Sequence, residues 1–324
     1  MPLVKYFLLD RVSLPCYITC MQNIADYDKQ GYDYTQYWED KDITRKYEDQ
    51  AERIAIKRML RHIPEGGTYL DLGAGFGRLF GAYASHFDTV IVSDYSIENL
   101  KKAHSMHATR ENTYFVAANA YHLPFRDQSL SALQTVRMMH HIENADGVMA
   151  EISRTIKESG YAVIEYANKR HFLAVVKYFM RKGKRNPFKH EPEDQSDLFY
   201  NFHPTWIEGK IRKSGLSIRR ILSVSNLRAG LIKKILPVSV MVLLEKVFQI
   251  LFAPIRFAPS IFVLAQKGTG KLKNSRTKEQ EALTGILQCP SCTSHLLLFA
   301  QTHILCNGCH KSYPIIDGIY DFRV

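Results

Sequence analysis

The stretch "TYLDLGAGFGRL", residues 68–79, decides the fold class of this 324-residue chain. It opens with the apolar alternation of a strand and then places glycine at Gly73, Gly75 and Gly77. A glycine-rich turn after a strand usually binds phosphate. Here Asp71 precedes the turn, and a carboxylate repels phosphate in a partly dry site. The stretch therefore favours a ligand without phosphate that is positively charged.

The glycine spacing also differs from that of a dinucleotide-binding turn. That motif is G-x-G-x-x-G, whereas this chain has G-x-G-x-G and places Arg78 where the motif has its last glycine. S-adenosylmethionine meets the charge requirement, because its sulfonium and its α-amino group are cationic. The glycines would let the backbone approach the methionine half of this cofactor closely.

Strands and helices alternate after this turn. Strands are predicted at 68–72, 89–93, 113–118, 130–136 and 160–166, and helices at 77–87, 96–107 and 145–158. This alternation indicates βαβ units and a parallel sheet. A further helix at 201–215, with His203 as N-cap and Pro204 in its first turn, precedes two closing strands at 216–224 and 260–267. The predicted fold class is α/β, with a Rossmann-like, mostly parallel sheet.

Polar residues stand where the predicted strands end. Asp94 ends the second strand, and its carboxylate can accept hydrogen bonds from both ribose hydroxyls. Tyr95 follows and can cover one face of an adenine. Asn119 and Ala120 end the third strand, where an amide can both donate to and accept from the adenine edge. These residues predict an adenosine site beside the glycine turn.

Four segments together resemble a known family. "YLDLGAGFG", "VSDYS", "ANAYHLPF" and "HHIENADGVMAEISRTIKESGYAVIEY" are similar to successive motifs of class I S-adenosylmethionine-dependent methyltransferases. The pattern is closest to the type 11 subgroup, which includes ubiquinone and menaquinone methyltransferases. The resemblance covers residues 43–167 and, more loosely, 200–266. It implies a seven-stranded sheet with one reversed strand at the edge.

The resemblance also implies a set of cofactor contacts. These are Asp71, Gly73, Ala74, Gly75, Asp94, Tyr95, Asn119 and Ala120. The chain departs from the family at Asn119, where aspartate is usual, and at Leu130-Ser131, where Phe-Asp is frequent. Neither change removes a required hydrogen-bonding group, because asparagine keeps an acceptor oxygen.

The candidate catalytic residues follow the fourth and fifth strands. Methyl transfer is an in-line displacement that depends mainly on alignment, and a base is needed only when the nucleophile holds its proton. His140 and His141 in "MMHHIE" are the predicted bases, with helix capping and packing as the alternative. Tyr166 and Asn168 are candidates to face the acceptor. His203 is expected to act as a helix cap.

The net charge of +11 is concentrated in one segment. Residues 168–234 contain sixteen Lys and Arg against five acids, a difference of +11. This pattern suggests an anionic partner, either RNA or a peripheral membrane contacted through residues 168–256, with an ordinary solvated face as the alternative. Within it, "ILPVSVMVLLEKVFQILFAP" predicts an inserted apolar helix. That helix would pack on the core, or cover an apolar acceptor at a membrane surface.

The cysteines near the C-terminus have a metal-binding spacing. Cys289, Cys292, Cys306 and Cys309 form C-x2-C-x13-C-x2-C, which is typical of a closed structural zinc site, with redox-active pairs as the alternative. A module of this size cannot bury enough core to fold alone. Cys16 and Cys20 are expected to be unrelated buried thiols.

The tail also resembles a second family. With "YPIIDGI" at 313–319, the cysteines are similar to the zinc-ribbon proteins that partner and activate RNA and release-factor methyltransferases. The resemblance implies a ribbon that packs on or serves the methyltransferase domain of the same chain. A ribbon that recruits substrate fits the pattern equally well.

The expected organisation has four parts. They are an N-terminal arm at 1–41, a methyltransferase domain at 42–267 with an inserted apolar segment at 228–258, a linker at 268–281 and a zinc ribbon at 282–324. The sequence shows neither a secretory signal nor an uninterrupted apolar run of about 18–20 residues, so we expect a cytoplasmic protein, with peripheral membrane attachment as an alternative.

The expected function is methyl transfer to an O, N or C nucleophile of a small or lipid-like acceptor. An RNA methyltransferase is the first alternative, although the chain lacks the Asn-Pro-Pro-aromatic motif of amino methylation. A non-catalytic scaffold that binds S-adenosylmethionine is the second.

Overall fold

The computed structural model describes residues 24, 27–30, 35, 38, 43–183, 185–194, 199–270, 283–295 and 297–323. Cys16 and Cys20 lie outside these residues, as do most of the predicted arm and of the predicted linker. In the arm, the described residues include the short helix α1 (Tyr27–Gln30).

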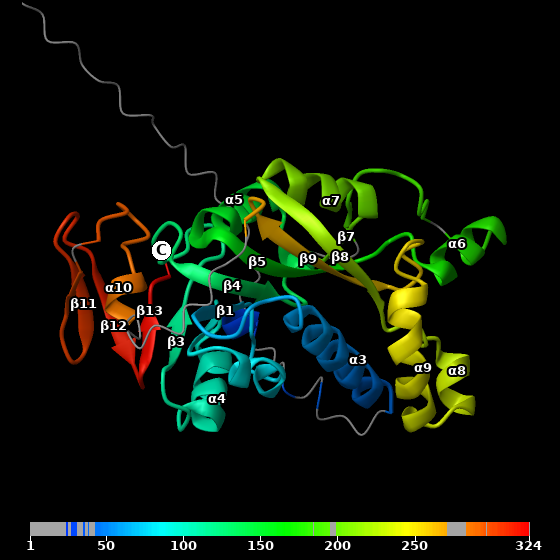
Figure 1. Ribbon diagram of the computed structural model, residues 1–324, viewed down its shortest axis with the longest axis horizontal. Helices are drawn as coiled ribbons and strands as arrows, with labels where there is room; N and C mark the ends of the chain where they lie inside the picture. Colours follow the sequence, from blue (N-terminus) through cyan, green and yellow to red (C-terminus); the bar gives the residue numbers. More distant parts are fainter. Residues whose placement is uncertain are drawn as a thin grey trace, which may run out of the picture.

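Seven strands form the sheet of the α/β region, in the order β3-β2-β1-β4-β5-β9-β8 (Figure 1). Their bounds are β1 (Thr68–Leu72), β2 (Thr89–Asp94), β3 (Thr113–Ala117), β4 (Leu130–Thr135), β5 (Ile156–Ala167), β8 (Leu216–Val224) and β9 (Ser260–Lys267). All neighbours are parallel except the pairs that β9 makes with β5 and β8. The predicted α/β, Rossmann-like fold with a mostly parallel sheet is confirmed.

The family resemblance implied that the reversed strand lies at the edge of the sheet, and this prediction is wrong. β9 lies one place further in, between β5 and β8. The burial of the two strands explains this order. β9 is buried along almost its whole length, as a strand with neighbours on both sides must be. β8 has exposed residues through its middle, so it suits the outer position.

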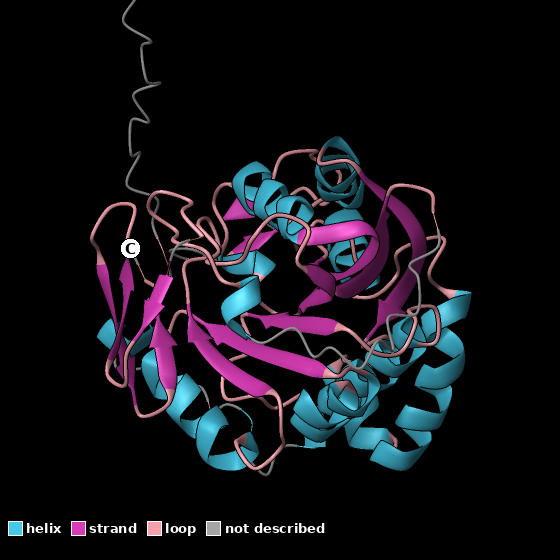
Figure 2. Cartoon of the chain, turned by 60° about the vertical axis from the view of Figure 1, so that its left-hand side comes forward, coloured by secondary structure: helices cyan, strands magenta, loops and turns pink. Residues whose placement is uncertain are grey.

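Helices cover both faces of the sheet (Figures 1 and 2). α3 (Ile43–Leu60) and α4 (Ile97–His107) pack in the core of one face, and α5 (Ala145–Thr155) and α7 (Pro204–Lys213) in the core of the other. Successive strand residues such as Tyr69 and Leu70 belong to opposite cores because side chains alternate along a strand.

The segment 77–87 is not the α-helix that its apolar spacing predicts. It forms two short 3-10 turns, η1 (Phe80–Ala82) and η2 (Ala84–His86). Tyr83 lies between them with φ −130°, outside the helical region. This backbone places the Tyr83 ring 5.0 Å from that of Tyr69 and its hydroxyl on Asp71, so tertiary contacts override the local pattern.

The C-terminal segment continues the same sheet. It contains α10 (Leu283–Ile286) and the strands β10 (Leu297–Phe299), β11 (His303–Cys306), β12 (Ser312–Ile316) and β13 (Ile319–Asp321). β13 pairs in parallel with β3, and the Phe322 amide donates to the Ala117 carbonyl at 2.8 Å. The C-terminal module therefore packs on the α/β domain by extending its sheet, as the resemblance led us to expect.

The remaining elements form one end of the molecule (Figure 1). α6 (Phe172–Phe179) follows β5, and β6 (Glu193–Asp194) pairs with β7 (Tyr200–Asn201). α8 (Gly230–Ile235) and α9 (Val238–Leu251) occupy the predicted apolar insertion.

A buried carboxylate joins α9 to the rest of the fold. Glu245 accepts hydrogen bonds from the Tyr47 hydroxyl at 2.6 Å and from the amides of Ser225 at 2.8 Å and Asn226 at 3.1 Å. Burial raises the pKa of this carboxyl. One face of the apolar helix is thus fixed to α3 by polar contacts in a dry environment.

We predict that Glu245→Ala lowers the free energy of unfolding by about 2–4 kcal/mol, because it leaves several buried donors without an acceptor. Urea denaturation followed by circular dichroism measures the change. The neighbouring exposed substitution Lys246→Ala should change stability by no more than about 0.5 kcal/mol. Equal unfolding midpoints for the two variants would contradict the anchoring role of Glu245.

Candidate active site

The glycine turn after β1 has the backbone that its sequence predicts. Gly73, Gly75 and Gly77 have φ values of +75°, +56° and +76°, in the region that favours glycine. The amides of Gly73 and Ala74 donate to the Ser93 carbonyl at 2.8 and 3.0 Å. A Cβ atom at Gly73 would lie 2.6 Å from that of Met138. The turn is therefore held closely between the carboxyl ends of β2 and β4.

Asp94 ends β2 and lies directly beside this turn. Its carboxylate accepts hydrogen bonds from the amides of Gly75 at 2.7 Å and Ser96 at 2.9 Å. Burial raises its pKa, although these amide donors oppose the shift. The Ala118 amide donates to the Asp94 carbonyl at 3.1 Å, so the ends of β2 and β3 are tied together.

Asn119 is buried and its Oδ1 accepts from the Tyr121 amide at 3.0 Å, while Ala120 packs at the edge of the core. The structure thus brings the predicted adenosine residues and the glycine turn to one edge of the sheet. Their roles toward the cofactor stay predictions.

Asp71 lies beneath the turn, in β1. It is buried, and the Tyr83 hydroxyl donates to it at 2.6 Å. Burial raises the pKa of this carboxyl to about 6, against the opposing hydrogen bonds of Tyr83 and Gln134. A carboxylate that is costly to ionise in this position gains from a nearby cation, which fits the charge argument from the sequence.

Two arginines, Arg137 and Arg78, to which the sequence assigned no role, organise the same region. Arg137, just after β4, donates to Glu52 at 2.7 Å and to Glu48 at 2.8 Å. Arg78 also pairs with Glu52, and its guanidinium lies 3.6 Å from the ring centroid of Trp38. Burial would raise the pKa of Glu52, but Arg137 and Arg78 hold it below its usual value. These contacts fix the loops after β1 and β4 to α3.

The C-terminal module reaches the loop that follows β2. Arg323 donates to the Tyr95 carbonyl at 3.2 Å, and its guanidinium lies 5.5 Å from the Tyr95 ring centroid. It also pairs with Asp28 of α1 at 3.7 Å. Tyr95, predicted to cover the adenine, is therefore in contact with the module. No sequence signal indicated this role for Arg323.

His140 and His141 lie in η3 (Met139–His141), at the carboxyl end of β4 as predicted. Their ring centroids are 4.1 Å apart, and the His140 ring lies 4.5 Å from that of Phe199. Burial lowers the pKa of His140 well below the usual histidine value, and the nearby cations lower it further. His140 is therefore neutral near pH 7 and able to accept a proton.

An apolar cavity of about 570 Å³ opens at the carboxyl end of β5. Its walls include Phe172, Phe199, Phe248, Phe252 and Phe257. Since Phe199 also packs against the predicted base His140, the cavity borders the end of β4.

The cavity contains a histidine that sequence analysis missed. His171, the N-cap of α6, lines the cavity together with Asn168 and Arg228. Burial and the adjacent Arg228 and Lys177 lower the pKa of His171 to about 4, so it too is neutral near pH 7. His171 reaches the cavity because α6 packs against the loop before β9. In that contact the Phe172 amide donates a hydrogen bond to the Phe257 carbonyl.

The other acceptor candidates have structural contacts. Tyr166 is fully buried and donates to Glu208 at 3.0 Å, so it points into the core rather than toward the cavity. Asn168 lines the cavity, but its side-chain amide donates hydrogen bonds to the carbonyls of Arg256 and Ala258, both at 2.8 Å. His203 occupies the N-cap position of α7, as predicted, but its side chain caps no backbone amide and its ring contacts the Thr205 hydroxyl instead.

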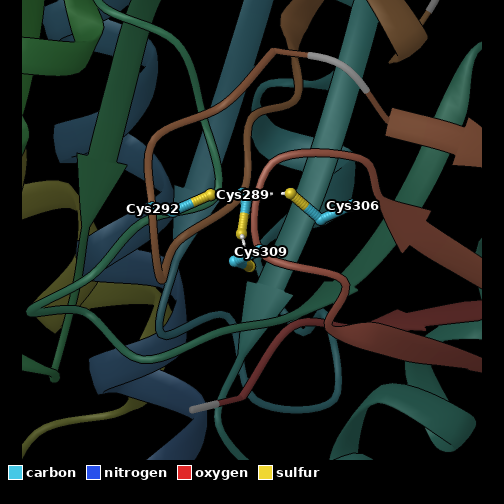
Figure 3. Close-up of side chains that lie close together, drawn as sticks. All are labelled: Cys289, Cys292, Cys306 and Cys309. Carbon is cyan, nitrogen blue, oxygen red and sulfur yellow. Dashed lines mark hydrogen bonds between the residues drawn. The ribbon is translucent and has the colours of Figure 1, made fainter.

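The four C-terminal cysteines converge, although two lie before β10 and two at the end of β11 (Figure 3). Their sulfurs all lie within 4.8 Å of one another, with Cys289 and Cys309 at 3.7 Å and Cys292 and Cys306 at 3.5 Å. A tetrahedral zinc–thiolate site, with Zn–S bonds of about 2.3 Å, needs sulfurs about 3.8 Å apart. The donor set is therefore compatible with zinc.

A family model matches the segment that holds these predicted residues. Residues 70–164, from within β1 to within β5, match the model of a methyltransferase domain. The chain is an S-adenosylmethionine-dependent methyltransferase. This identification favours an enzyme over the non-catalytic scaffold that the sequence left open.

Three relatives illustrate the range of the match. The methyltransferase is 25% identical to the O-methyltransferase rstn1 of Aspergillus nomiae over 167 residues, which are 48% of this chain and 67% of that protein. It is 32% identical to a demethylmenaquinone methyltransferase of Thermobifida fusca over 101 residues, 31% of this chain and 43% of that protein. A third match is a chain from the solved complex of the Haloferax volcanii Trm112 methyltransferase activator with a methyltransferase. It superposes with a TM-score of 0.50 at 16% identity, and the match covers 74% of this chain and 99% of that chain. That last likeness concerns the fold alone.

We predict that the methyltransferase binds S-adenosylmethionine more weakly as the pH falls through about 6. Protonation of Asp71, whose pKa is raised to about 6, removes the negative charge that favours the cationic cofactor. Calorimetric titration at pH 7.5 and pH 5 should differ about tenfold in Kd. Asp71→Asn should bind weakly at both values. A variant that keeps the full pH dependence would show that another group is responsible.

Proposed function

We propose that the methyltransferase transfers the methyl group of S-adenosylmethionine to an O, N or C nucleophile of a small apolar or lipid-like acceptor. The observation that carries the proposal is the cavity of about 570 Å³ with five phenylalanine rings in its walls. Pockets of this size and character bind small apolar molecules and use a few polar groups to orient them. The demethylmenaquinone methyltransferase among the relatives supports an acceptor like those of the ubiquinone and menaquinone subgroup.

The bound cofactor and the acceptor would meet at the edge of the sheet, between the carboxyl ends of β1 and β5. We propose that the turn of Gly73, Ala74 and Gly75, with Asp71, holds the methionine half of the cofactor, and that Asp94, Tyr95, Asn119 and Ala120 hold its adenosine. When bound, S-adenosylmethionine supplies an electrophilic methyl group on a good leaving group. The protein's contribution is then alignment of the acceptor, for which effective-molarity arguments allow roughly 7–11 kcal/mol.

Two neutral imidazoles are candidates for the base. His140 lies at the end of β4 beside Phe199, and His171 lies within the cavity wall. Because the pKa of each is lowered, both imidazoles are neutral at pH 7 and have the free nitrogen that a general base needs, but each is a weaker base than an ordinary imidazole. His141, the other predicted base, lies next to His140 and is only partly buried.

The structure gives less support to RNA as the acceptor. Several cations of the basic segment are engaged in ion pairs within the fold. These pairs are Arg185–Glu193, Lys210–Asp146, Arg228–Glu48 and Arg256–Glu208. Charges that are neutralised in this way contribute little to a phosphate-binding surface.

The proposal is tested with methyl-labelled S-adenosylmethionine and a cell extract separated into RNA, protein, lipid and small-molecule fractions. We expect label in the lipid or small-molecule fraction. Asp94→Ala should abolish that label, because it removes the carboxylate beside the glycine turn. Label confined to the RNA fraction would refute an apolar acceptor, and full activity of Asp94→Ala would refute the adenosine assignment.

We also propose that the four cysteines hold a structural zinc ion, which makes residues 282–324 a zinc ribbon that stabilises the methyltransferase domain at 42–267. The four converging thiolates would complete a closed tetrahedron with no position for substrate. Zinc binding would supply the stability that so small a module lacks.

We predict one zinc per chain by elemental analysis of the purified protein. Cys306→Ser should lose the metal and expose the tail to proteolysis, since the site needs all four thiolates. The exposed substitution Gln301→Ala, on the turn between β10 and β11, should retain it. A metal-free wild-type protein, or a Cys306→Ser variant that still holds one zinc, would contradict the assignment.

A further inference from the structure

The helices α6, α8 and α9 lie at one end of the molecule (Figure 1), and each of them has exposed apolar side chains. Among the described residues, all but three of the large apolar side chains that are exposed fall between residues 172 and 255. Those of α9 recur at helical spacing on its outward face: Val240, Leu243, Val247, Ile250 and Leu251. The outward face of a surface helix is normally polar, so this one is unusual.

α6 and the loop after it add an aromatic cluster. Phe179 is 71% exposed, and its ring lies 5.7 Å from Tyr178 and 6.0 Å from Phe188. Leu173 and Met180 are also exposed there. No residue of α6 is buried, although its sequence is predominantly apolar.

The charges on these segments have one sign. Residues 172–189 and 230–256 contain a single acid, Glu245, which lies on the buried face of α9. Exposed cations surround the apolar residues: Lys177, Arg181, Lys182, Lys189, Lys234 and Lys246. The surface therefore combines exposed apolar side chains with positive charge, although one of its cations, Arg185, is paired with the Glu193 carboxylate at 2.9 Å.

We propose that this surface, formed by α6, residues 180–183 and 185–189 and the outward face of α9, docks on a lipid bilayer that contains anionic headgroups. Apolar side chains would enter the boundary of the acyl region while the cations contact phosphates, which is how interfacial helices bind. Among the described residues, no helix has both the length and the apolar character that crossing a bilayer requires.

The composition of the surface favours a bilayer over other occupants. A second copy of the chain would bring the same cations against one another, which is unfavourable. RNA would engage the cations and the aromatic rings, but it gives no role to the exposed aliphatic residues of α9. Only a surface that is both anionic and apolar satisfies the two kinds of side chain together.

Docking would also orient the cavity. Phe172 and Leu173 of α6 and Phe248 of α9 line it, as does Phe252, the C-cap of α9, so the helices that would contact the bilayer also form its walls. A lipid-like acceptor could then pass from the membrane into the cavity without crossing water. This last step rests on the proposed function, whereas the docking itself does not.

The experiment is flotation of the full chain with phosphatidylcholine vesicles, with and without phosphatidylglycerol. We expect binding to the anionic vesicles that weakens as salt rises. Arg181→Gln/Lys182→Gln should lower the partition coefficient, by about fivefold for each charge removed. Leu243→Gln/Ile250→Gln should lower it at least tenfold. The matched control is Leu298→Gln, an exposed leucine in the module at the opposite end, which should bind like the wild type.

Several results would overturn the proposal. These are no binding to anionic vesicles at low salt, equal binding to neutral vesicles, and an equal loss in the Leu298→Gln control. A concentration-dependent dimer that Leu243→Gln/Ile250→Gln dissociates, without vesicle binding, would assign the surface to self-association instead. Binding of RNA in place of vesicles would likewise refute docking on a bilayer. Vesicle binding by a protein that labels only the RNA or protein fraction of the extract would leave the docking standing and refute the proposed acceptor class.

Discussion

The predicted active site depends on two hydrogen bonds from the Gly73 and Ala74 amides to the Ser93 carbonyl. They bind the turn after β1 to the end of β2, and only glycine has the freedom to adopt the turn's left-handed backbone without strain. Once the turn is fixed, Asp94 meets the Gly75 amide and Asp71 remains buried beneath it. Every strand end that contributes a candidate residue is positioned relative to this contact. The remainder of the sheet acts as a rigid support for it.

Local sequence predicted much of this arrangement because the determining features are local. The glycine spacing, the acids at the strand ends and the paired C-x-x-C motifs each lie within a few residues. The segment 77–87 was predicted as a helix because its apolar spacing was taken alone. Its actual form depends on Tyr83 reaching Asp71, which is a tertiary contact. The position of β9 between β5 and β8 was equally inaccessible, since strand order is decided by pairing across long separations.

The candidate site was predictable only in part, for the same reason. Arg137 meets Glu48 across 89 positions of sequence, and Arg323 meets Tyr95 across 228. No pattern in a single sequence links such partners. His171 has an unremarkable context in the chain and becomes a cavity residue only through the packing of α6. The buried Glu245 looked like an interruption of an apolar helix, whereas it is the point at which that helix is attached.

The pairing of β13 with β3 has a consequence for how the C-terminal module is held. Only three residue pairs form this parallel ladder. Two separate proteins that form a stable complex usually need an interface of about 1,200–2,000 Å². Because the module belongs to the same chain, its association is intramolecular, and its occupancy is independent of how much protein a cell makes. Contacts outside the ladder add to it, since the Arg126 amide donates to the Ile286 carbonyl at 2.8 Å and the Gln288 amide to the Pro124 carbonyl at 3.0 Å.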